Sequence, residues 1–458
     1  MGDKTALVFK DIELSWNELL EETKNAAAGI AEKVNSKNQE IVGILLTNSD
    51  DFIISYLGIL EAGHIALPLD PNFKQLEFDV ILHQIPPKFV ITNEDYAARF
   101  DHRDVDAVLV NEIRIDSPHD HKPIRLSAEK QIATIVFTSG TTGKPKAATY
   151  SHANHAWNIE VCSKVWKWTS EDTLLISLPL SHWYGLVMGL AGVLYHGNTL
   201  YLQEWFDADE TLKYLSSGKI SQFTHVAQFY SKLLEIPGDY DLSKIRLCIS
   251  GGAPMAPDVW QQFKDRWGQE VLEVYGSSET GRIASNLLDE RIPGSPGRPL
   301  PSVDVKLSSD GEVLVKSGGL FPGYYKNPVA TKRGFTKEGY WRTGDIGEFE
   351  NGRLLLKGRK IERIRKKGYT ISPRDVEWAM RQNPKVEDIH VMSRQMPGSQ
   401  DDQLVYFMVT KLNEQDIADY CKQNLLFAWR PDKIVMLKSL PRTNNGKVAL
   451  AKLKGMIN

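Results

Sequence analysis

The chain alternates short apolar runs with amphipathic stretches. Apolar runs occur at Ile41–Leu46, Phe89–Thr92 and Ala107–Val110, whereas Trp16–Lys33 repeats its apolar residues at helical spacing. Short apolar runs between polar segments are typical of buried strands, and the helical spacing is typical of helices that cover a sheet. The mixture continues to about Leu356. It predicts a large α/β domain.

The pattern changes after residue 356. Residues 357–367 are markedly basic, and Ser372-Pro373-Arg374-Asp375 predicts the start of a helix, with Ser372 as N-cap and Pro373 at the first helical position. Strands are expected near 388–393 and 403–410, a helix near 415–424 and an extended segment at 433–440. We therefore expect a large domain over residues 1–356, a hinge at 357–362 and a small α+β domain over 363–458.

Composition and charge narrow the class of function. The 458 residues are 42% hydrophobic and 25% charged, which is typical of a globular chain with more than one domain. The net charge of −3 gives no reason to expect nucleic acid as a partner. The most apolar stretch, Ile53–Leu69, is interrupted by Glu61 and His64, which is wrong for a membrane span. The three cysteines support neither a disulfide framework nor a zinc site, so we expect a cytoplasmic protein that acts on small molecules.

The segment 132–146, IATIVFTSGTTGKPK, is the strongest single signal. A β-branched run leads into a loop rich in glycine, hydroxyl and lysine side chains. Glycines let backbone N–H groups approach a phosphate, and Lys144 or Lys146 supplies positive charge. The glycine spacing and Pro145 do not fit a Walker A loop. The loop is therefore predicted to bind phosphate, with a structural turn as the alternative.

These residues, Phe137 to Lys146, resemble the signature loop of the adenylate-forming superfamily, which includes acyl- and aryl-CoA ligases. Ala147 departs from it, since the family usually has glycine there. Further motifs resemble the family in the same order along the chain: LPLSHWYGL at 178–186, ISGGAP at 249–254, YGSSETG at 275–281, YWRTGDIG at 340–347, GRKIERIRKKGYTISPRDVE at 358–377 and PRTNNGK at 441–447. The resemblance spans nearly the whole chain. It implies a large adenylate-forming domain with several subdomains and a small, mobile C-terminal domain.

The resemblance implies a nucleotide site built from many of these motifs. Tyr275 would stack on adenine, Asp345 would bind the ribose hydroxyls, Glu279 would bind Mg²⁺ and Lys447 would be the adenylation lysine. Taken alone, Glu279 and Lys447 also fit solvated surface charges. The nucleotide-binding residues implied are Thr138, Ser139, Gly140, Thr141, Thr142, Gly143, Lys144, Gly251, Gly252, Ala253, Tyr275, Gly276, Ser277, Ser278, Asp345, Arg359 and Lys447, and the catalytic ones are Lys447, Glu279, His182 and Thr138.

The acyl pocket is predicted around P-x-x-H-x-x-G at 179–185. No acid occurs between Leu178 and Gly185 to hold a substrate ammonium, which favours an uncharged acyl or aryl chain over an amino acid. His182 would close the pocket near the reacting carboxylate, although a packed core histidine fits the same pattern. The stretches WFDADETL at 205–212 and FYSKLL at 229–234 also resemble malonyl-CoA synthetases. Arg282 could pair with a second carboxylate or face solvent. The predicted pocket residues are His182, Trp183, Tyr184, Phe229 and Arg282.

The second half-reaction transfers the acyl group to a thiol, and in this superfamily the small domain rotates between the two steps. Gly368 would line the thiol tunnel, and Arg365, Lys366 and Lys367 could meet the phosphates of CoA, or simply be exposed charges. Ile361 stands where the family usually has an Asp or Lys hinge residue.

The sequence thus predicts an acid–thiol ligase that uses ATP and Mg²⁺ to form an acyl-AMP with release of pyrophosphate, and then an acyl-CoA. A carboxylic acid and CoA are the predicted substrates. Two alternatives stay open: a ligase that loads the phosphopantetheine of an acyl carrier protein, and a degenerate nucleotide-binding protein without activity.

Overall fold

The structure is a computed structural model of the chain. It describes residues 2–73, 75–101, 103–115, 123–124, 131–138, 146–360, 364–366, 369–371, 373–395, 402–425, 427–443 and 446–457. The chain forms two compact units, one of Met1–Asp304 with Lys316–Trp341 and the other of Val305–Val315 with Arg342–Asn458. Each unit is described by itself.

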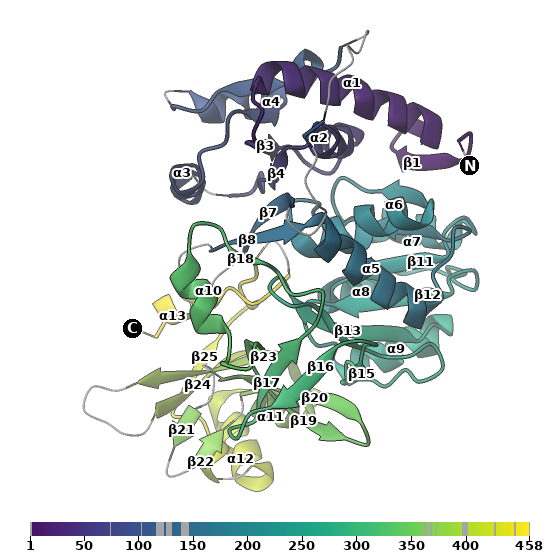
Figure 1. The fold of residues 1–458 in the computed structure, drawn as a ribbon. Coiled ribbons are helices and arrows are strands. Elements are labelled where there is room, and N and C mark those ends of the chain that lie inside the picture. The colour runs from purple at the N-terminus through teal and green to yellow at the C-terminus, as the bar shows by residue number, and fades with distance from the viewer. Residues whose placement is uncertain are drawn as a thin grey trace. The chain divides into compact units, whose positions relative to one another are not determined.

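The first unit contains a seven-stranded sheet (Figure 1). Its central strands pair in parallel, and β8 and β18 add an antiparallel edge. The strand order is β18 (Gly323–Tyr324), β8 (Lys146–Ser151), β7 (Ile132–Thr138), β4 (Ile65–Pro68), β3 (Ile41–Leu45), β5 (Val90–Thr92) and β6 (Ala107–Leu109). The helices of this region are α1 (Trp16–Val34), α2 (Asp50–Glu61), α3 (Gln75–Gln84) and α4 (Glu94–Ala97).

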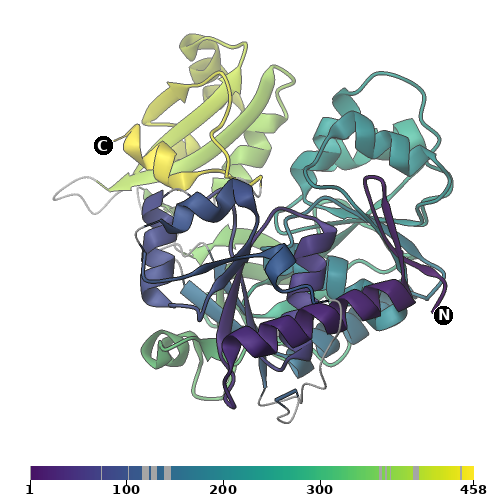
Figure 2. The same cartoon turned by 90° about the horizontal axis from the view of Figure 1, so that it is seen from above.

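Local chemistry explains where the first helix begins and how it packs. Ser15 and Glu18 form a capping box, in which the Ser15 hydroxyl accepts from the Glu18 N–H and the Glu18 carboxylate accepts from the Ser15 N–H. The helices α1 and α2 lie side by side (Figure 2). A Cβ on Gly58 of α2 would come within 2.9 Å of Ala26 Cβ in α1, so this contact requires small residues.

The first unit also contains a nine-stranded sheet. Its order is β15 (Arg298–Pro299), β14 (Gly281–Ser285), β13 (Val271–Ser277), β12 (Leu247–Gly251), β11 (Gln222–His225), β9 (Thr173–Ile176), β10 (Thr199–Leu202), β1 (Thr5–Phe9) and β2 (Ile12–Ser15). Strands β9, β11, β12 and β13 are parallel. Because the carboxyl ends of parallel strands share one edge, the loops that follow these four strands lie at that edge.

Helices connect the strands of this second sheet. They are α5 (His152–Trp166), the π-helix at Gly185–Ala191, α6 (Gly192–His196), α7 (Ala208–Ser216), α8 (Ala227–Glu235) and α9 (Pro257–Trp267), and α10 (Pro328–Gly334) follows β18. Ser151 caps α5 in a capping box with Asn154.

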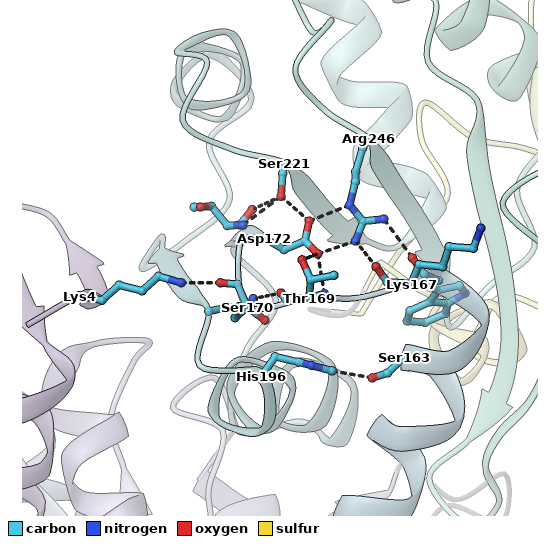
Figure 3. Close-up of polar contacts among 12 residues, drawn as sticks. Lys4, Ser163, Lys167, Thr169, Ser170, Asp172, His196, Ser221 and Arg246 are labelled. Atoms are coloured by element: carbon cyan, nitrogen blue, oxygen red, sulfur yellow. Dashed lines mark hydrogen bonds and ion pairs between the residues drawn. The ribbon is translucent and has the colours of Figure 1, made fainter. Parts of the chain in front are cut away.

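A polar network fixes the connection between α5 and β9 (Figure 3). Arg246 donates to both carboxylate oxygens of the buried Asp172, at 2.7 and 2.5 Å, and Ser221 donates to Asp172 Oδ1 at 2.8 Å. Lys4 reaches the carbonyl of Ser170 from the N-terminal segment. Asp172 and Arg246 pair with each other, and the Lys4 ammonium donates to backbone carbonyls, so we interpret the network as structural.

The second unit contains three small sheets and three helices in its described part. A four-stranded sheet has the order β16 (Asp304–Leu307), β17 (Glu312–Lys316), β19 (Trp341–Glu350) and β20 (Arg353–Arg359), β21 (Ile364–Lys366) pairs with β22 (Tyr369–Ile371), and the third sheet is β23 (Val386–Gln395), β24 (Asp402–Thr410) and β25 (Lys433–Met436). The helices are α11 (Pro373–Arg381), α12 (Glu414–Asn424) and α13 (Leu450–Gly455).

The predicted elements are present with small shifts at their ends. The strand expected at 433–440 ends at Met436, and α11 begins at Pro373, while its predicted cap Ser372 lies outside the described residues. The predicted hinge 357–362 falls within the second unit, where β20 runs through Arg359, and Ile361 lies outside the described residues. The hinge and the boundary at 356 stay predictions. No helix in the described part of the chain is long and apolar enough to span a membrane.

Candidate active site

The predicted acyl loop, residues 178–185, follows β9 and is held by one buried side chain. Asn48 Nδ2 donates to the carbonyls of Leu178 and Gln203 at 3.0 and 3.1 Å, and Asn48 Oδ1 accepts from the N–H of Leu180 at 2.8 Å. At Gly185 the backbone passes so close that a Cβ would lie 2.4 Å from the carbonyl oxygen of Pro179. The loop therefore has a fixed backbone.

His182 is not a fully packed core histidine. Its side chain keeps 21% of its accessible surface, and its Nε2 lies 3.1 Å from Oδ2 of Asp70, which is buried in the loop after β4. The contact joins the loop after β4 of the seven-stranded sheet to the loop after β9 of the nine-stranded sheet.

Trp183, Tyr184 and Arg282 come together, as predicted for the acyl pocket. The Arg282 guanidinium carbon lies 4.4 Å from the ring centroid of Tyr184 and 5.0 Å from that of Trp183. Arg282 is only 2% exposed, so the alternative that it faces solvent is wrong. Among the described residues, Nε and Nη2 of Arg282 have no hydrogen-bond partner, and neither do Trp183 Nε1 and the Tyr184 hydroxyl.

Phe229, also predicted for the pocket, lies on α8 in a different aromatic group. Its ring centroid is 3.9 Å from that of His225 and 4.2 Å from that of Phe206. His225 accepts a hydrogen bond from the N–H of Val226, and burial lowers its pKa to about 3, so this imidazole is neutral.

The YGSSETG motif forms the end of β13 and its turn into β14. At Gly276 a Cβ would lie 2.0 Å from the carbonyl oxygen of Gly281, so only glycine fits. The carboxylate of Glu279 accepts from the Ser277 hydroxyl at 3.0 Å and from the Tyr324 hydroxyl at 2.8 Å. The carbonyl of Ser278 accepts from the Tyr150 hydroxyl at 2.6 Å.

The two ends of the loop that is predicted to bind phosphate lie next to this turn. Strand β7 ends at Thr138 and β8 begins at Lys146, whose Nζ lies 5.2 Å from the ring centroid of Tyr324. Ala147 is buried in a hydrophobic cluster, where its methyl group is accommodated. The residues predicted to bind phosphate within the loop, Ser139, Gly140, Thr141, Thr142, Gly143 and Lys144, lie outside the described residues.

The turn after β12 carries Gly251, Gly252 and Ala253. A Cβ on Gly251 would lie 2.7 Å from the Tyr184 hydroxyl, so the turn passes close to the acyl loop. Gly252 has a φ of +78°. Glu273 of β13 accepts from the N–H groups of Met255 and Gly294, at 3.2 and 2.7 Å, and so ties the turn to the neighbouring strand. Tyr275, two residues further, is buried, and its stacking on adenine stays a prediction.

In the second unit, the predicted ribose ligand Asp345 meets Arg359. Arg359 Nε lies 3.1 Å from Asp345 Oδ1, across the antiparallel pair of β19 and β20. The buried carboxylate of Glu312 accepts from the N–H of Gly344 at 3.2 Å and from Lys360 at 2.9 Å. The RTGD segment is thus fixed within this unit.

The basic residues of the second unit differ in their surroundings. Lys447 lies on a turn where its carbonyl accepts from the N–H of Thr443 at 2.7 Å. Lys366, predicted for CoA phosphates, is 6% exposed and lies 2.7 Å from both Asp432 Oδ2 and the carbonyl of Arg430, so its ammonium is already engaged. The side chain of Arg365 and all of Lys367 and Gly368 lie outside the described part.

The donor set around Glu279 fits Mg²⁺. This ion is usually bound by one or two carboxylates together with phosphate oxygens and water. Glu279 supplies such a carboxylate, oriented by two hydroxyl groups. Among the described residues no group of three or more His, Cys, Asp or Glu could form a complete protein cage for a metal, so phosphate would have to complete the shell.

Comparison with known proteins identifies the family. Residues 1–325 match the AMP-binding enzyme family and residues 375–447 match the AMP-binding enzyme C-terminal domain. The chain belongs to the AMP-binding enzyme family. The predicted superfamily and the mixed α/β fold, with a large N-terminal and a small C-terminal domain, are confirmed.

Individual relatives align over almost the whole chain. The mitochondrial malonate–CoA ligase of Mus musculus is 28% identical over 98% of this chain and 87% of its own. The 2-succinylbenzoate–CoA ligase of Listeria monocytogenes is 28% identical over 98% of this chain and 96% of its own. The ATP-bound structure of MatB from Rhodopseudomonas palustris superposes with a TM-score of 0.92, at 25% identity and over 99% of this chain and 96% of that one.

Four residues of the site were not predicted from the sequence. Asn48, Asp70, Glu273 and Tyr324 each hold a predicted residue or its loop, and three of them lie far from it along the chain. The only sequence signals were weak: Asp70 directly follows the apolar run of β4, and Tyr324 lies in a Pro-Gly-Tyr-Tyr turn.

Tyr324→Phe tests whether the Tyr324 hydroxyl orients the metal ligand. A hydrogen bond to a charged group contributes about 1.5–3 kcal/mol, so we expect the Mg²⁺ concentration for half-maximal pyrophosphate release to rise about tenfold or more. Binding of Mn²⁺ with ATP, followed by electron paramagnetic resonance, gives a readout without turnover. Tyr325→Phe, which changes a neighbouring ring that packs in a hydrophobic cluster, is the control. Equal metal dependence in both variants would contradict the role.

Glu273→Gln tests whether the buried carboxyl of Glu273 makes stability depend on pH. Glu273 lies on β13, the strand that also carries Tyr275. Burial raises the pKa of Glu273 to about 7 from its ordinary value of 4.5. Between pH 4.5 and 7 the carboxyl of Glu273 is ionised in the unfolded chain but protonated in the folded protein. The contribution of the protonated Glu273 to the free energy of unfolding is therefore fully present below about pH 4.5 and is lost as the pH rises through 7. Over that pH range the free energy of unfolding of Glu273→Gln should rise by roughly 3 kcal/mol relative to that of wild type.

Thermal unfolding at several pH values checks this prediction. The difference in Tm between Glu273→Gln and wild type should grow from pH 4.5 to 7.5. Glu270→Gln, at a side chain that is 37% exposed, should show no such trend. A constant difference for Glu273→Gln would show that the carboxyl does not titrate in this range.

Proposed function

We propose that this chain joins a small dicarboxylic acid to CoA, and that Arg282 binds the carboxylate that does not react. The reaction class is that of an ATP-dependent acid–thiol ligase, with ATP and Mg²⁺ used for adenylation and CoA as the acceptor. The nature of the acid is the part that rests on the geometry of Arg282.

The observation that carries the proposal is the buried guanidinium of Arg282, which has no anionic partner in the part of the chain that the structure describes. A charged group taken out of water is strongly unfavourable unless it is paired, and leaving one charge of a buried pair uncompensated costs about 3–5 kcal/mol. Burial lowers the pKa of Arg282, but a guanidinium stays charged at neutral pH. The contrast is Arg246 in the same unit, which has Asp172 as its partner. A substrate carboxylate would supply the missing anion.

The geometry around Arg282 suits a carboxylate. Tyr184 and Trp183 lie against the guanidinium, and no described residue hydrogen-bonds to Nε or Nη2. These two N–H groups can donate side by side to the two oxygens of one carboxylate. The unpartnered Tyr184 hydroxyl and Trp183 Nε1 can donate to the same ligand. Malonate and 2-succinylbenzoate, named for the relatives above, both carry two carboxylates.

The other predicted residues take the roles that the resemblance gives them, as part of the proposal. Glu279 would hold Mg²⁺, which when bound neutralises charge on the ATP phosphates. Thr138 and Lys146 stand at the two ends of the phosphate-binding loop. In the second unit, Asp345 and Lys447 would serve the ribose and the developing charge at the α-phosphate.

Acceptor and location also belong to the proposal. The relatives described above are named as CoA ligases, and no observation favours an acyl carrier protein as acceptor. The inactive alternative gains no support either, because the side chains of Glu279, Asp345 and Arg359 are all held in place by neighbours. We place the protein in the cytoplasm, since its three cysteines are buried free thiols.

Arg282→Met tests the substrate class. Pyrophosphate release is measured with dicarboxylic acids and with monocarboxylic acids of equal chain length. Loss of a desolvated charge pair should lower kcat/KM for the dicarboxylic acid roughly 10²- to 10³-fold, whereas kcat/KM for the monocarboxylic acid should stay the same or rise.

Arg298→Met is the matched control, because Arg298 lies on the adjacent strand β15 but is paired with Glu290 at 3.0 Å. It should leave the preference unchanged. A wild-type preference for monocarboxylic acids, or an equal loss for both acids in Arg282→Met, would overturn the assignment of Arg282.

A further inference from the structure

Both oxygens of the Asp70 carboxylate have hydrogen-bond partners within the protein. Asp70 Oδ1 accepts from the backbone N–H and the side-chain Nδ2 of Asn72, at 2.8 and 3.0 Å, and Oδ2 faces His182 Nε2 at 3.1 Å. Asp70 is 4% exposed. Burial alone would raise the pKa of Asp70, but its hydrogen bonds and the charge of His182 outweigh burial and leave that pKa below its usual value. Asp70 is therefore an anion.

An anionic Asp70 fixes the imidazole of His182. A carboxylate can only accept, so Nε2 of His182 must carry a hydrogen whether the ring is neutral or protonated. The ring orientation is fixed with it, because one edge is tied to Asp70. Nδ1 has no hydrogen bond to another described residue, and the side chain is partly accessible. Nδ1 is thus the nitrogen left for a ligand.

The backbone of the acyl loop does not depend on Asp70. Asn48 binds the backbone of Leu178 and Leu180, and the close approach at Gly185 constrains the other end of the loop. Asp70 contacts the loop through the side chain of His182. Removing the carboxylate would therefore free the ring while the loop stays in place.

We propose that Asp70 is a positioning residue for the adenylation step: it fixes the ring of His182 through Nε2–H, so that Nδ1 is presented to the incoming acid and, when protonated, donates a hydrogen bond to its carboxylate. This inference rests on the proposed function for the role of His182, since the acid is the ligand that the imidazole would meet. It adds a residue from the first seventy of the chain to a site whose predicted members begin at Thr138.

Two substitutions of Asp70 distinguish the effect of its charge from the effect of its size. Asp70→Asn keeps the size, but its amide N–H₂ can face Nε2 and favour the wrong tautomer of the ring, whereas Asp70→Ala removes the partner altogether. Both should lower kcat/KM for the acid about 10- to 100-fold, which is typical when a group that orients a reacting side chain is lost. KM for ATP should change less than twofold in both.

Asp172→Asn is the matched control, because Asp172 is an equally buried carboxylate in the same unit (Figure 3) that pairs with Arg246 and not with a predicted site residue. It should lower Tm and leave kcat/KM for the acid unchanged. If Asp172→Asn lowers kcat/KM as much as Asp70→Asn does, the effect is general destabilisation and the proposal is wrong.

Nitrogen-15 NMR of the histidines tests Asp70 without any substrate. The signal of His182, assigned by its loss in His182→Gln, should show a protonated Nε2 in wild type and a change of tautomer or exchange between tautomers in Asp70→Asn. An unchanged signal would overturn the proposal. If wild type activates no acid, the proposed function fails, yet the NMR result still decides whether Asp70 fixes the ring.

Discussion

The buried positive charge of Arg282, which no described carboxylate balances, is the constraint on which the proposed acyl pocket depends. The chain buries this guanidinium between Trp183 and Tyr184 and offers it no carboxylate among the described contacts. Such an arrangement is unfavourable for folding alone, and proteins generally keep it where a ligand completes it. The fixed backbone of the acyl loop, held by Asn48, keeps the two rings in position.

The negative charge of Glu279, which is proposed to bind the metal, is also held in place by its neighbours. Glu279 is oriented by Ser277 and Tyr324, and Lys146 lies next to Tyr324, so the proposed metal ligand and one end of the predicted phosphate-binding loop contact the same ring. Under the proposed function, Arg282 of the first unit would bind the acid and Glu279 would bind the metal. Each of these side chains has neighbours that leave it little freedom to move.

Much of this could be predicted from the sequence because motifs are local. The strands follow from short segments, and the resemblance to the family named Trp183 and Arg282, which the fold brings together, whereas the role of the loop at 139–145 stays a prediction. Asp70 and Tyr324 could not be found this way, since each acts on a residue that only the fold brings near. Lys366 shows the converse: its motif suggests an exposed cation, and burial against Asp432 engages it instead.

The most direct test of the central claim is mass spectrometry of the products formed by wild-type protein from ATP, Mg²⁺ and pooled mono- and dicarboxylic acids, with and without CoA. We expect the acyl-AMP of a dicarboxylic acid when CoA is absent and the corresponding acyl-CoA when it is present. Adenylates of monocarboxylic acids alone, or no adenylate from any acid, would contradict the central claim.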